Sequence, residues 1–213
     1  MKTVATLVTT LFLWPLSVCQ AQVIQVEITE VPYEAPYAFL AFHYGFGGNQ
    51  TVERKSGGAS ATTPQTEYSL RIQGARDTNI QAEIELGYRK IDLENLGDSE
   101  GLSFTSVGLG GRYYPRYPTF GLGSGLAGRL TASALGGFTY SGNRSTTDLL
   151  GQEVFTDGSF STDLRLTAGL AFSGREEPSG LTAEIVYRPN SASNLEYSAE
   201  PAWAIRIGFL FGP

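Results

Sequence analysis

The sequence predicts an all-β fold, namely an eight-stranded antiparallel transmembrane β-barrel of up-and-down topology. Three observations predict it. Eight short runs alternate apolar and polar residues, long polar connections separate every second pair of runs, and most arginines fall on one parity of the alternation. A period of two is the pattern of a strand whose two faces meet different surroundings.

The first 21 residues have the layout of a secretory signal peptide. Lys2 precedes an apolar run that ends at Val18, and the small residues Cys19 and Ala21 suit cleavage after Ala21. The run is too short for an ordinary membrane-spanning helix. "LSVC" also resembles a lipoprotein cleavage box, in which case Cys19 would carry a lipid. Because Cys19 is the only cysteine, cleavage after Ala21 predicts an exported chain without disulfides.

Residues 22–36 are expected to form a periplasmic N-terminal segment that leads into the barrel. This segment alternates as well, so residues 23–31 could form a further strand. Pro32 and Pro36 argue against continuous pairing into the barrel, because proline cannot donate a hydrogen bond to a ladder. The barrel itself is expected to occupy residues 37–213.

The barrel strands are predicted from alternating runs that are bounded by turn residues. They span 37–46, 66–74, 80–89, 104–114, 126–140, 159–173, 181–188 and 202–211. The first, third, fifth and seventh connections are long and polar, the second and sixth are short, and the fourth is longer than this scheme expects. Long loops at one end and tight turns at the other are typical of bacterial outer-membrane barrels, so we expect the cell outer membrane as the location.

Alternation alone does not say which face of the sheet points outward. On the apolar parity, aromatic residues such as Tyr44, Tyr88 and Trp203 gather at strand ends, and aliphatic residues such as Ile84 and Leu130 occupy strand middles. A bilayer selects this order, because aromatic rings favour the headgroup level. An exported soluble barrel of the lipocalin type would also alternate and remains an alternative.

The opposite parity carries seven of the twelve arginines, several carboxylates and no lysine. A narrow lumen favours arginine, because its planar guanidinium can bridge carboxylates through two hydrogen bonds. The interior of an eight-stranded barrel is only wide enough for packed side chains. We therefore predict a polar network inside the barrel, made of His43, Glu67, Arg71, Glu83, Glu85, Arg89, Arg112, Arg129, Asp163, Arg165, Glu184, Arg188 and Arg206.

Two features of this face could carry chemistry. His43 is the only histidine, and we expect it to be a hydrogen-bonded member of the network, although lipid A-modifying barrels also use a histidine. Glu83 and Glu85 lie about 7 Å apart by strand rise. That spacing would suit a glycosidase pair, but the surrounding arginines favour a structural lattice of ion pairs. No catalytic residue, metal site or cofactor is predicted.

The C-terminal run "AWAIRIGFLFGP" resembles the signal by which outer-membrane barrels are recognised for assembly, and "GLGGRYYP" resembles strand ends of the small OmpA-like and OmpX-like barrel families. The resemblance covers about residues 37–211. It departs at Gly212 and Pro213, because such proteins usually end on the aromatic residue itself. It implies outer-membrane lipid, lipopolysaccharide and the barrel-assembly machinery as partners.

The function expected from these observations is that of a non-enzymatic outer-membrane barrel. Its lumen would be plugged by charged side chains, and it would act in envelope integrity or in surface interaction through its loops. The full chain has 15 basic and 21 acidic residues, a net charge of −6, which argues against a nucleic-acid partner. A lipid A-modifying enzyme and a soluble periplasmic lipid carrier are the alternatives.

Overall fold

The structure is a computed structural model. It describes residues 27–29, 38–74, 79–96, 101–115, 119–121, 126–142, 144–147, 153–156, 158–174, 179–189, 192–193 and 197–212. The predicted signal peptide and most of residues 22–36 lie outside this part of the chain, so the cleavage after Ala21 and the fate of Cys19 stay predictions.

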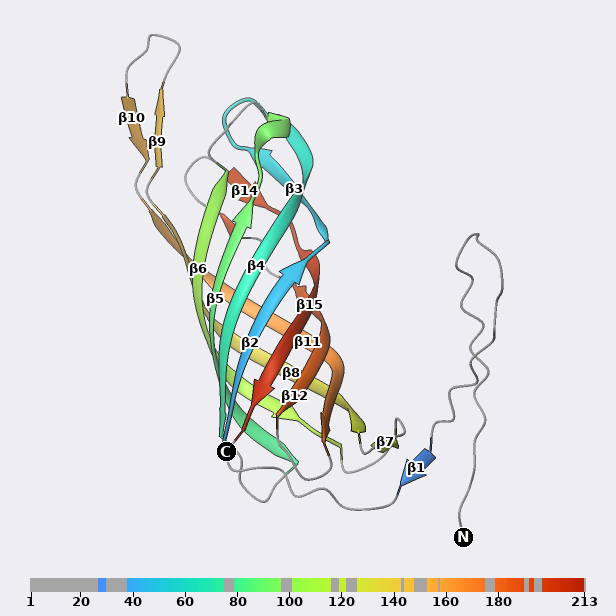
Figure 1. Ribbon diagram of the computed structural model, residues 1–213. Helices are drawn as coiled ribbons and strands as arrows, with labels where there is room; N and C mark the ends of the chain where they lie inside the picture. Colours follow the sequence, from blue (N-terminus) through green and yellow to red (C-terminus); the bar gives the residue numbers. More distant parts are fainter. Residues whose placement is uncertain are drawn as a thin grey trace, which may run out of the picture.

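Eight long strands form a closed barrel (Figure 1). They are β2 (Ala38–Phe46), β4 (Ser60–Gly74), β5 (Ile80–Ile91), β6 (Leu102–Tyr113), β8 (Leu126–Ser141), β11 (Ser159–Gly174), β12 (Gly180–Arg188) and β15 (Ala202–Phe211). Each pairs antiparallel with the next strand of this set, and β15 pairs with β2. The predicted fold class and all eight predicted strands are confirmed.

The register places like faces side by side around the barrel. Ile84 of β5 lies opposite Ile72 of β4 and Leu109 of β6, all on the outer face. One residue further along β5, Glu85 lies opposite Arg71. Because side chains alternate along a strand, a slip by one residue would move every charge of β5 onto the outer face. The register is therefore fixed by the sorting of residues between the two faces.

The two faces of the wall differ sharply in exposure. Ile84 is 44% exposed, whereas Glu85 is 0% exposed. Aromatic side chains stand on the outer face near both ends of the barrel. Tyr187 stacks on Trp203 at 4.4 Å between ring centroids, and the large outward aromatics include Tyr44, Phe46, Tyr68, Tyr88, Tyr113, Phe209 and Phe211. The wall is thus an apolar surface around a polar interior, which is the arrangement of a membrane-spanning barrel.

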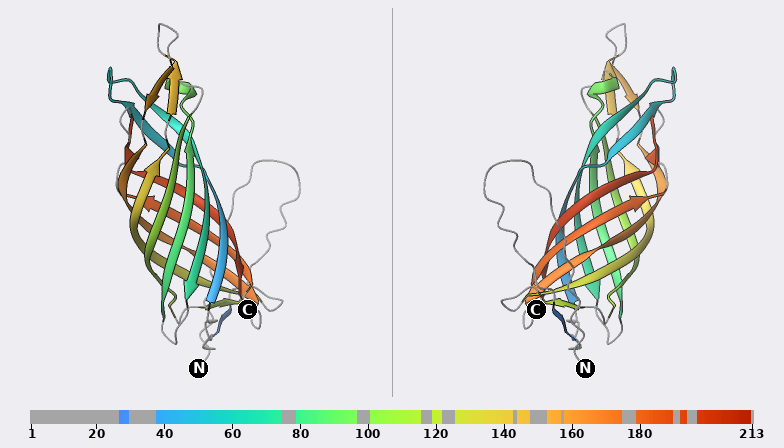
Figure 2. Two further views of the ribbon diagram at one scale, coloured as in Figure 1. Left: turned by 90° about the vertical axis from the view of Figure 1, so that its left-hand side faces the viewer. Right: turned by 90° about the vertical axis from the view of Figure 1, so that its right-hand side faces the viewer.

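One end of the barrel, here called the outer end, continues beyond the wall as further strands (Figures 1 and 2). These are β3 (Asn49–Arg54), β9 (Arg144–Thr147), β10 (Glu153–Thr156), β13 (Ala192–Ser193) and β14 (Tyr197–Ala199), with the short 3₁₀ helix η1 (Glu94–Leu96). β3 pairs with the first residues of β4 and with β14, and β9 pairs with β10. The sequence predicted polar loops here; in the structure, parts of them are strands.

At the opposite, inner end, β1 (Glu27–Thr29) pairs with β7 (Thr119–Gly121), and β7 pairs with the beginning of β8. β7 lies in the fourth connection, which was longer than the loop scheme expected. β1 is a short strand outside the closed circuit of eight, so it does not widen the barrel. Among the described residues, no helix has the length and hydropathy needed to cross a membrane.

Candidate functional site

Buried polar side chains of the described residues converge in the interior of the barrel. All thirteen residues predicted for the interior network are buried, and none of them is more than 8% exposed. They come from all eight barrel strands, and β6 and β8 contribute one arginine each. Their ion-pair partners lie on neighbouring strands, as for Arg112 and Glu83, or across the lumen, as for Arg71 and Glu184.

Arg71 of β4 occupies the centre of this network. Its guanidinium lies 3.0 Å from an oxygen of Glu83, 3.3 Å from Glu85 and 2.6 Å from Glu184. Glu184 belongs to β12, on the far side of the lumen, so the contact joins two strands that are not neighbours. Ionised groups are expensive to bury unless they are paired, and here each guanidinium nitrogen faces a carboxylate.

Glu85 is the second centre. It accepts from Arg71, from Nη1 of Arg206 at 2.8 Å, and from Nη1 of Arg165. Arg165 also contacts Asp163, two residues away on β11, at 2.7 Å. Glu85 therefore links β4, β5, β11 and β15 through a single side chain. Removing this carboxylate would leave three arginines less well paired.

Towards the inner end, Arg112 contacts Glu83 at 2.7 Å and Glu184 at 2.9 Å. Tyr114 donates a hydrogen bond to Oε1 of Gln73 at 2.8 Å, and Nε2 of Gln73 donates to Glu83 at 3.1 Å. Tyr114 and Gln73 are uncharged members that the sequence prediction missed. Gln73 lies on the same parity as the arginines, so extending the parity argument to amides would have found it.

Towards the outer end, Glu67 lies 2.7 Å from Nη2 of Arg188 and 3.4 Å from Nη1 of Arg206. Arg89 donates to Oε1 of Gln50 at 3.2 Å, and its guanidinium lies 4.8 Å from the centre of the Phe104 ring. At the inner end, Arg129 lies near the beginning of β8, where it is buried and also takes part in a polar or ring interaction. The network therefore extends along the whole lumen.

Small residues give the arginines room. A Cβ on Gly108 would lie 2.9 Å from Nη2 of Arg165, and one on Gly45 would lie 3.1 Å from Cγ of Arg206. Contacts this close would force the arginines to shift. Glycine on the lumen face therefore leaves space for the guanidinium groups opposite.

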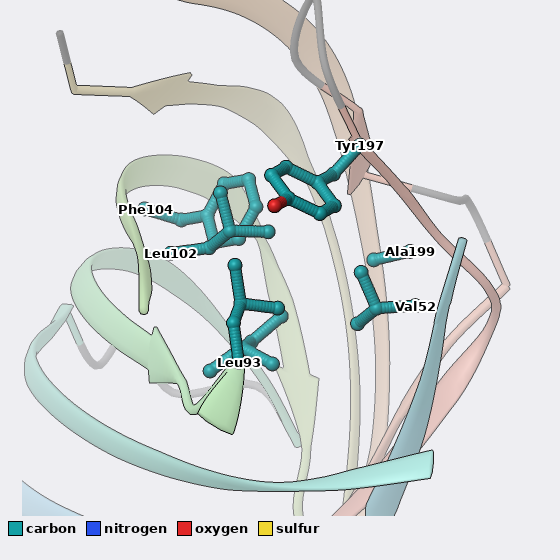
Figure 3. Close-up of a cluster of buried hydrophobic side chains, with 7 residues drawn as sticks. Val52, Leu93, Leu102, Phe104, Tyr197 and Ala199 are labelled. Carbon is teal, nitrogen blue, oxygen red and sulfur yellow. The ribbon is translucent and has the colours of Figure 1, made fainter. Parts of the chain in front are cut away.

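Two apolar clusters close the lumen. The outer cap consists of Val52, Ile91, Leu93, Leu102, Phe104, Tyr197 and Ala199 (Figure 3). Nη2 of Arg54 donates to the hydroxyl of Tyr197 at 2.8 Å and so joins β3 to β14. The inner cap consists of Ala41, Tyr114, Ala171 and Leu210. The described interior is thus a charged lattice between two apolar closures.

His43 does not make the hydrogen bond that the sequence analysis expected. Its side chain is fully buried, yet neither ring nitrogen has a hydrogen-bond partner among the described residues, and its nearest carboxylate, Glu184, is 3.8 Å away. The reason is competition, because Arg71 and Arg112 approach Glu184 more closely. The expected hydrogen bond of His43 was therefore wrong.

The arrangement around His43 is unsuited to nucleophilic catalysis. Ser69 lies opposite His43 in the ladder, but its hydroxyl accepts from Nη1 of Arg206 at 2.8 Å. A serine nucleophile needs a hydrogen bond to its histidine and access to substrate. The carboxylates Glu83 and Glu85 are likewise occupied by arginines.

The connection after β5 is held against β4, because Nδ2 of Asn95 donates to the carbonyl oxygen of Thr62 at 3.4 Å. Oδ1 of Asp92 accepts from the backbone N–H of Glu94 at 2.9 Å, which fixes the turn into η1. Asp98 and Glu100 lie outside the described residues. Within the described part of the chain, no three His, Cys, Asp or Glu side chains are grouped as metal ligands would be.

No protein-family model and no curated protein matches this chain. Among solved structures it is similar to Neisserial surface protein A, with 15% identity and a TM-score of 0.48 over 83% of this chain and 97% of that one. It is also similar to Ail of Yersinia pestis (14% identity, TM-score 0.41, 82% and 99% covered). The N-terminal β-barrel domain of Pseudomonas aeruginosa OprF gives 16% identity and a TM-score of 0.41, with 84% and 100% covered.

These likenesses concern the fold alone, and the barrel of this chain is established by its own strand pairing. The pairing closes eight antiparallel strands, the outside is apolar with aromatic residues near both ends, and the inside is filled by buried charges. This chain is therefore a small eight-stranded β-barrel of the kind that spans the outer membrane.

Proposed function

We propose that this protein is a non-enzymatic outer-membrane barrel with a charge-plugged lumen, and that it acts in surface interaction or envelope integrity through its outer end. One observation carries the proposal: the interior side chains bind one another from the inner cap to the outer cap. Groups that are already paired inside a closed barrel are unavailable to a substrate. Contacts with partners therefore fall to the surface.

The outer end supports a role at the surface. Strands β3 and β14 pair beyond the wall and pack on the outer cap, and the β9–β10 hairpin projects from the same end (Figure 1). A polar loop needs no such folding to connect two strands. We therefore assign partner binding to this end.

The remaining elements fit export to the outer membrane. The predicted signal peptide, residues 1–21, would bring the chain to the periplasm, and residues 22–36 would stay there. On β15 the exposed residues Trp203, Ile205, Ile207, Phe209 and Phe211 alternate with buried ones, which supports recognition of this strand by the barrel-assembly machinery. Lipid and lipopolysaccharide would surround the wall.

The two alternatives fit the geometry less well. A lipid A-modifying enzyme needs a histidine that meets lipid, and His43 is buried in the lumen. A soluble lipid carrier needs an apolar cavity and a polar outside, whereas this barrel has a polar interior and an apolar wall.

The proposal is tested by removing the β9–β10 hairpin. Residues 144–156 are replaced by a short Gly/Ser turn, and cells with the full-length protein, the shortened protein or neither are compared for adhesion and detergent sensitivity. We expect the shortened barrel to insert and keep its heat-modifiable gel mobility, but to lose the adhesion that full-length protein restores. The mass of lipid A is measured by mass spectrometry in the same cells and in a strain that carries His43→Ala. A lipid A mass change that depends on His43 would overturn the proposal.

A further inference from the structure

Lys90 is the one charged side chain on the outer face of the eight described barrel strands. Every other charged residue in these strands is buried in the lumen, whereas Lys90 is exposed. It follows Tyr88, one of the outward aromatic residues at the outer end of the wall, by two positions. A lysine on the lipid face is unfavourable near the middle of the bilayer and is tolerated only close to the headgroups.

The depth of Lys90 in the bilayer follows from its place along β5. Lys90 comes six positions after Ile84, which we expect near the middle of the acyl region. Six residues of a strand tilted by about 40° rise about 15 Å along the membrane normal. Half of the hydrocarbon core is about 15 Å thick as well. A Cβ on Gly101 would lie 3.3 Å from Cε of Lys90, so the end of the side chain lies beside the connection that follows β5. The ammonium group is therefore at the level of the lipid headgroups.

Two hydroxyl groups flank Lys90 on the neighbouring strands. Thr66 of β4 and Ser103 of β6 lie directly opposite Lys90 in the two ladders, and both are partly exposed. Residues that pair directly share a face of the sheet, with their Cβ atoms about 5 Å apart. One ammonium and two hydroxyls can therefore reach the same small group from three adjacent strands.

These three polar groups are available to a ligand. Within the described part of the chain, Lys90 has no ion-pair partner, and the hydroxyls of Thr66 and Ser103 have no hydrogen-bond partner. Asp92 is the acidic residue nearest to Lys90 in the sequence, but its Oδ1 accepts from the backbone N–H of Glu94. An ammonium at headgroup level whose donors are unused fits an anionic group of a lipid.

We propose that Lys90, Thr66 and Ser103 bind a phosphate group of an outer-leaflet lipid, and that this lipid is lipopolysaccharide, bound through a phosphate of its lipid A part. The ammonium supplies a positive charge, and the two hydroxyls donate hydrogen bonds to phosphate oxygens. Tyr88 lies one turn of the pleat below the site, where an aromatic ring suits the boundary between headgroups and acyl chains. Lipid A is the source because the end with the long connections faces the cell exterior in such barrels. The inference rests on the proposed function for this orientation alone.

The test measures lipid binding to purified protein, residues 22–213, in detergent micelles by native mass spectrometry. The probe is lipid A with both phosphates, and the same lipid without phosphates is the comparison. We expect one lipid A per barrel and no retention of the lipid that lacks phosphates. Lys90→Gln should weaken lipid A binding about fivefold, which is what one lysine contributes at an anionic lipid surface. Lys90→Arg should restore it.

Lys55→Gln is the matched control, because Lys55 is an exposed lysine in the turn between β3 and β4, beyond the wall. It removes the same charge from the same end of the molecule, and we expect it to bind lipid A as the unsubstituted chain does. Equal weakening by Lys90→Gln and Lys55→Gln would overturn the proposal, since any positive charge at the outer end would then suffice.

A second variant separates a built site from an isolated surface charge. Thr66→Val combined with Ser103→Ala keeps Lys90 but removes both hydroxyls, and we expect it to weaken lipid A binding about fivefold through the loss of two hydrogen bonds. Unchanged binding by this variant would overturn the proposal. Equal retention of phosphatidylglycerol and lipid A would also overturn it, because the site would then take any anionic lipid.

Folding of each variant is checked by its heat-modifiable gel mobility. Lys90, Thr66 and Ser103 all lie on the outer face, so these substitutions leave the interior network intact. The measurement uses no cells and no adhesion assay. A failure of the lipid site therefore leaves the proposed function standing, and a failure of the adhesion test leaves the lipid site standing.

Discussion

At the scale of single residues, Gly48 shows how closely the outer end is packed. Its φ is +82°, a backbone conformation that side chains with a Cβ rarely adopt. A Cβ there would lie 2.7 Å from the carbonyl carbon of Trp203 and 3.1 Å from Nε2 of Gln65, which itself donates to the Trp203 carbonyl at 2.8 Å. Gly47 precedes it with a φ of +70°, but nothing lies within 4 Å of its Cβ position.

The two glycines therefore form a matched pair. Gly47→Ala should cost about 1 kcal/mol of unfolding free energy for the positive φ alone. Gly48→Ala should cost about 3 kcal/mol, because the backbone of β15 must also move. Urea titrations of both variants in vesicles, followed by gel mobility, measure the difference. Equal losses would mean that the close approach of Gly48 to Trp203 does not matter.

His43 and Glu184 show which part of the site the sequence could predict. Parity along a strand is a local property, so it placed His43 and the charged residues on one face. Which residues form ion pairs is not a local property, because Arg71 and Glu184 are 113 residues apart in the sequence and meet across the lumen. His43 lacks the expected hydrogen bond because Arg71 and Arg112 contact Glu184 more closely. The residue pattern within β2 cannot predict this.

At the scale of elements, the prediction was accurate where the two faces differ in hydropathy. β5 was predicted over 80–89 and spans Ile80–Ile91. β4 was predicted over 66–74 but begins at Ser60. The prediction missed residues 60–65, "SATTPQ", because polar residues occur on both parities there and no apolar face is visible, although Thr63 is buried and Thr62 is exposed. The outer cap was missed for a similar reason, since Val52 and Tyr197 are isolated apolar residues in polar stretches.

The placement of β5 in the bilayer gives a prediction about a whole strand. Ile80, Ile84 and Tyr88 all face outward, with 62%, 44% and 43% exposure. Four residues of a tilted strand change depth by about 10 Å. A single tryptophan is introduced at each position after Trp203→Phe, which keeps an aromatic ring against Tyr187, and the variants are refolded into vesicles whose lipids carry bromine deep in the acyl chains.

Quenching of tryptophan fluorescence should be strongest at position 84 and weaker at positions 80 and 88. Phe104→Trp in the same background is the inward control and should be quenched weakly, because Phe104 is only 2% exposed. Weak quenching at all three outward positions would mean that β5 does not cross the acyl region. Strongest quenching at position 80 or 88 would mean that this position, and not position 84, lies nearest the middle of the bilayer.

At the scale of the whole molecule, closure and filling of the barrel go together. Eight strands leave an interior that side chains can fill, and among the described residues seven arginines and five carboxylates do so between two apolar caps. Salt bridges such as Arg71–Glu184 also connect opposite walls. The lattice therefore resists both passage through the barrel and flattening of its wall.

This filling predicts that the protein forms no steady open pore. The cavity that Arg89, Arg188 and Phe104 line beneath the outer cap has a volume of about 10 Å³, about the room that one water molecule needs. Further along the lumen, ion pairs such as Arg71–Glu184 and Arg206–Glu85 join side chains across the interior. Purified protein refolded into planar bilayers should show no uniform single-channel steps at voltages where an open porin, added as the positive control, conducts steadily. Insertion is checked separately by the heat-modifiable gel mobility of protein recovered from the same vesicles. Regular steps of one size would contradict the plugged lumen, because ions would then have to pass Arg71, Glu85 and Arg206 without disrupting the contacts that hold these strands together.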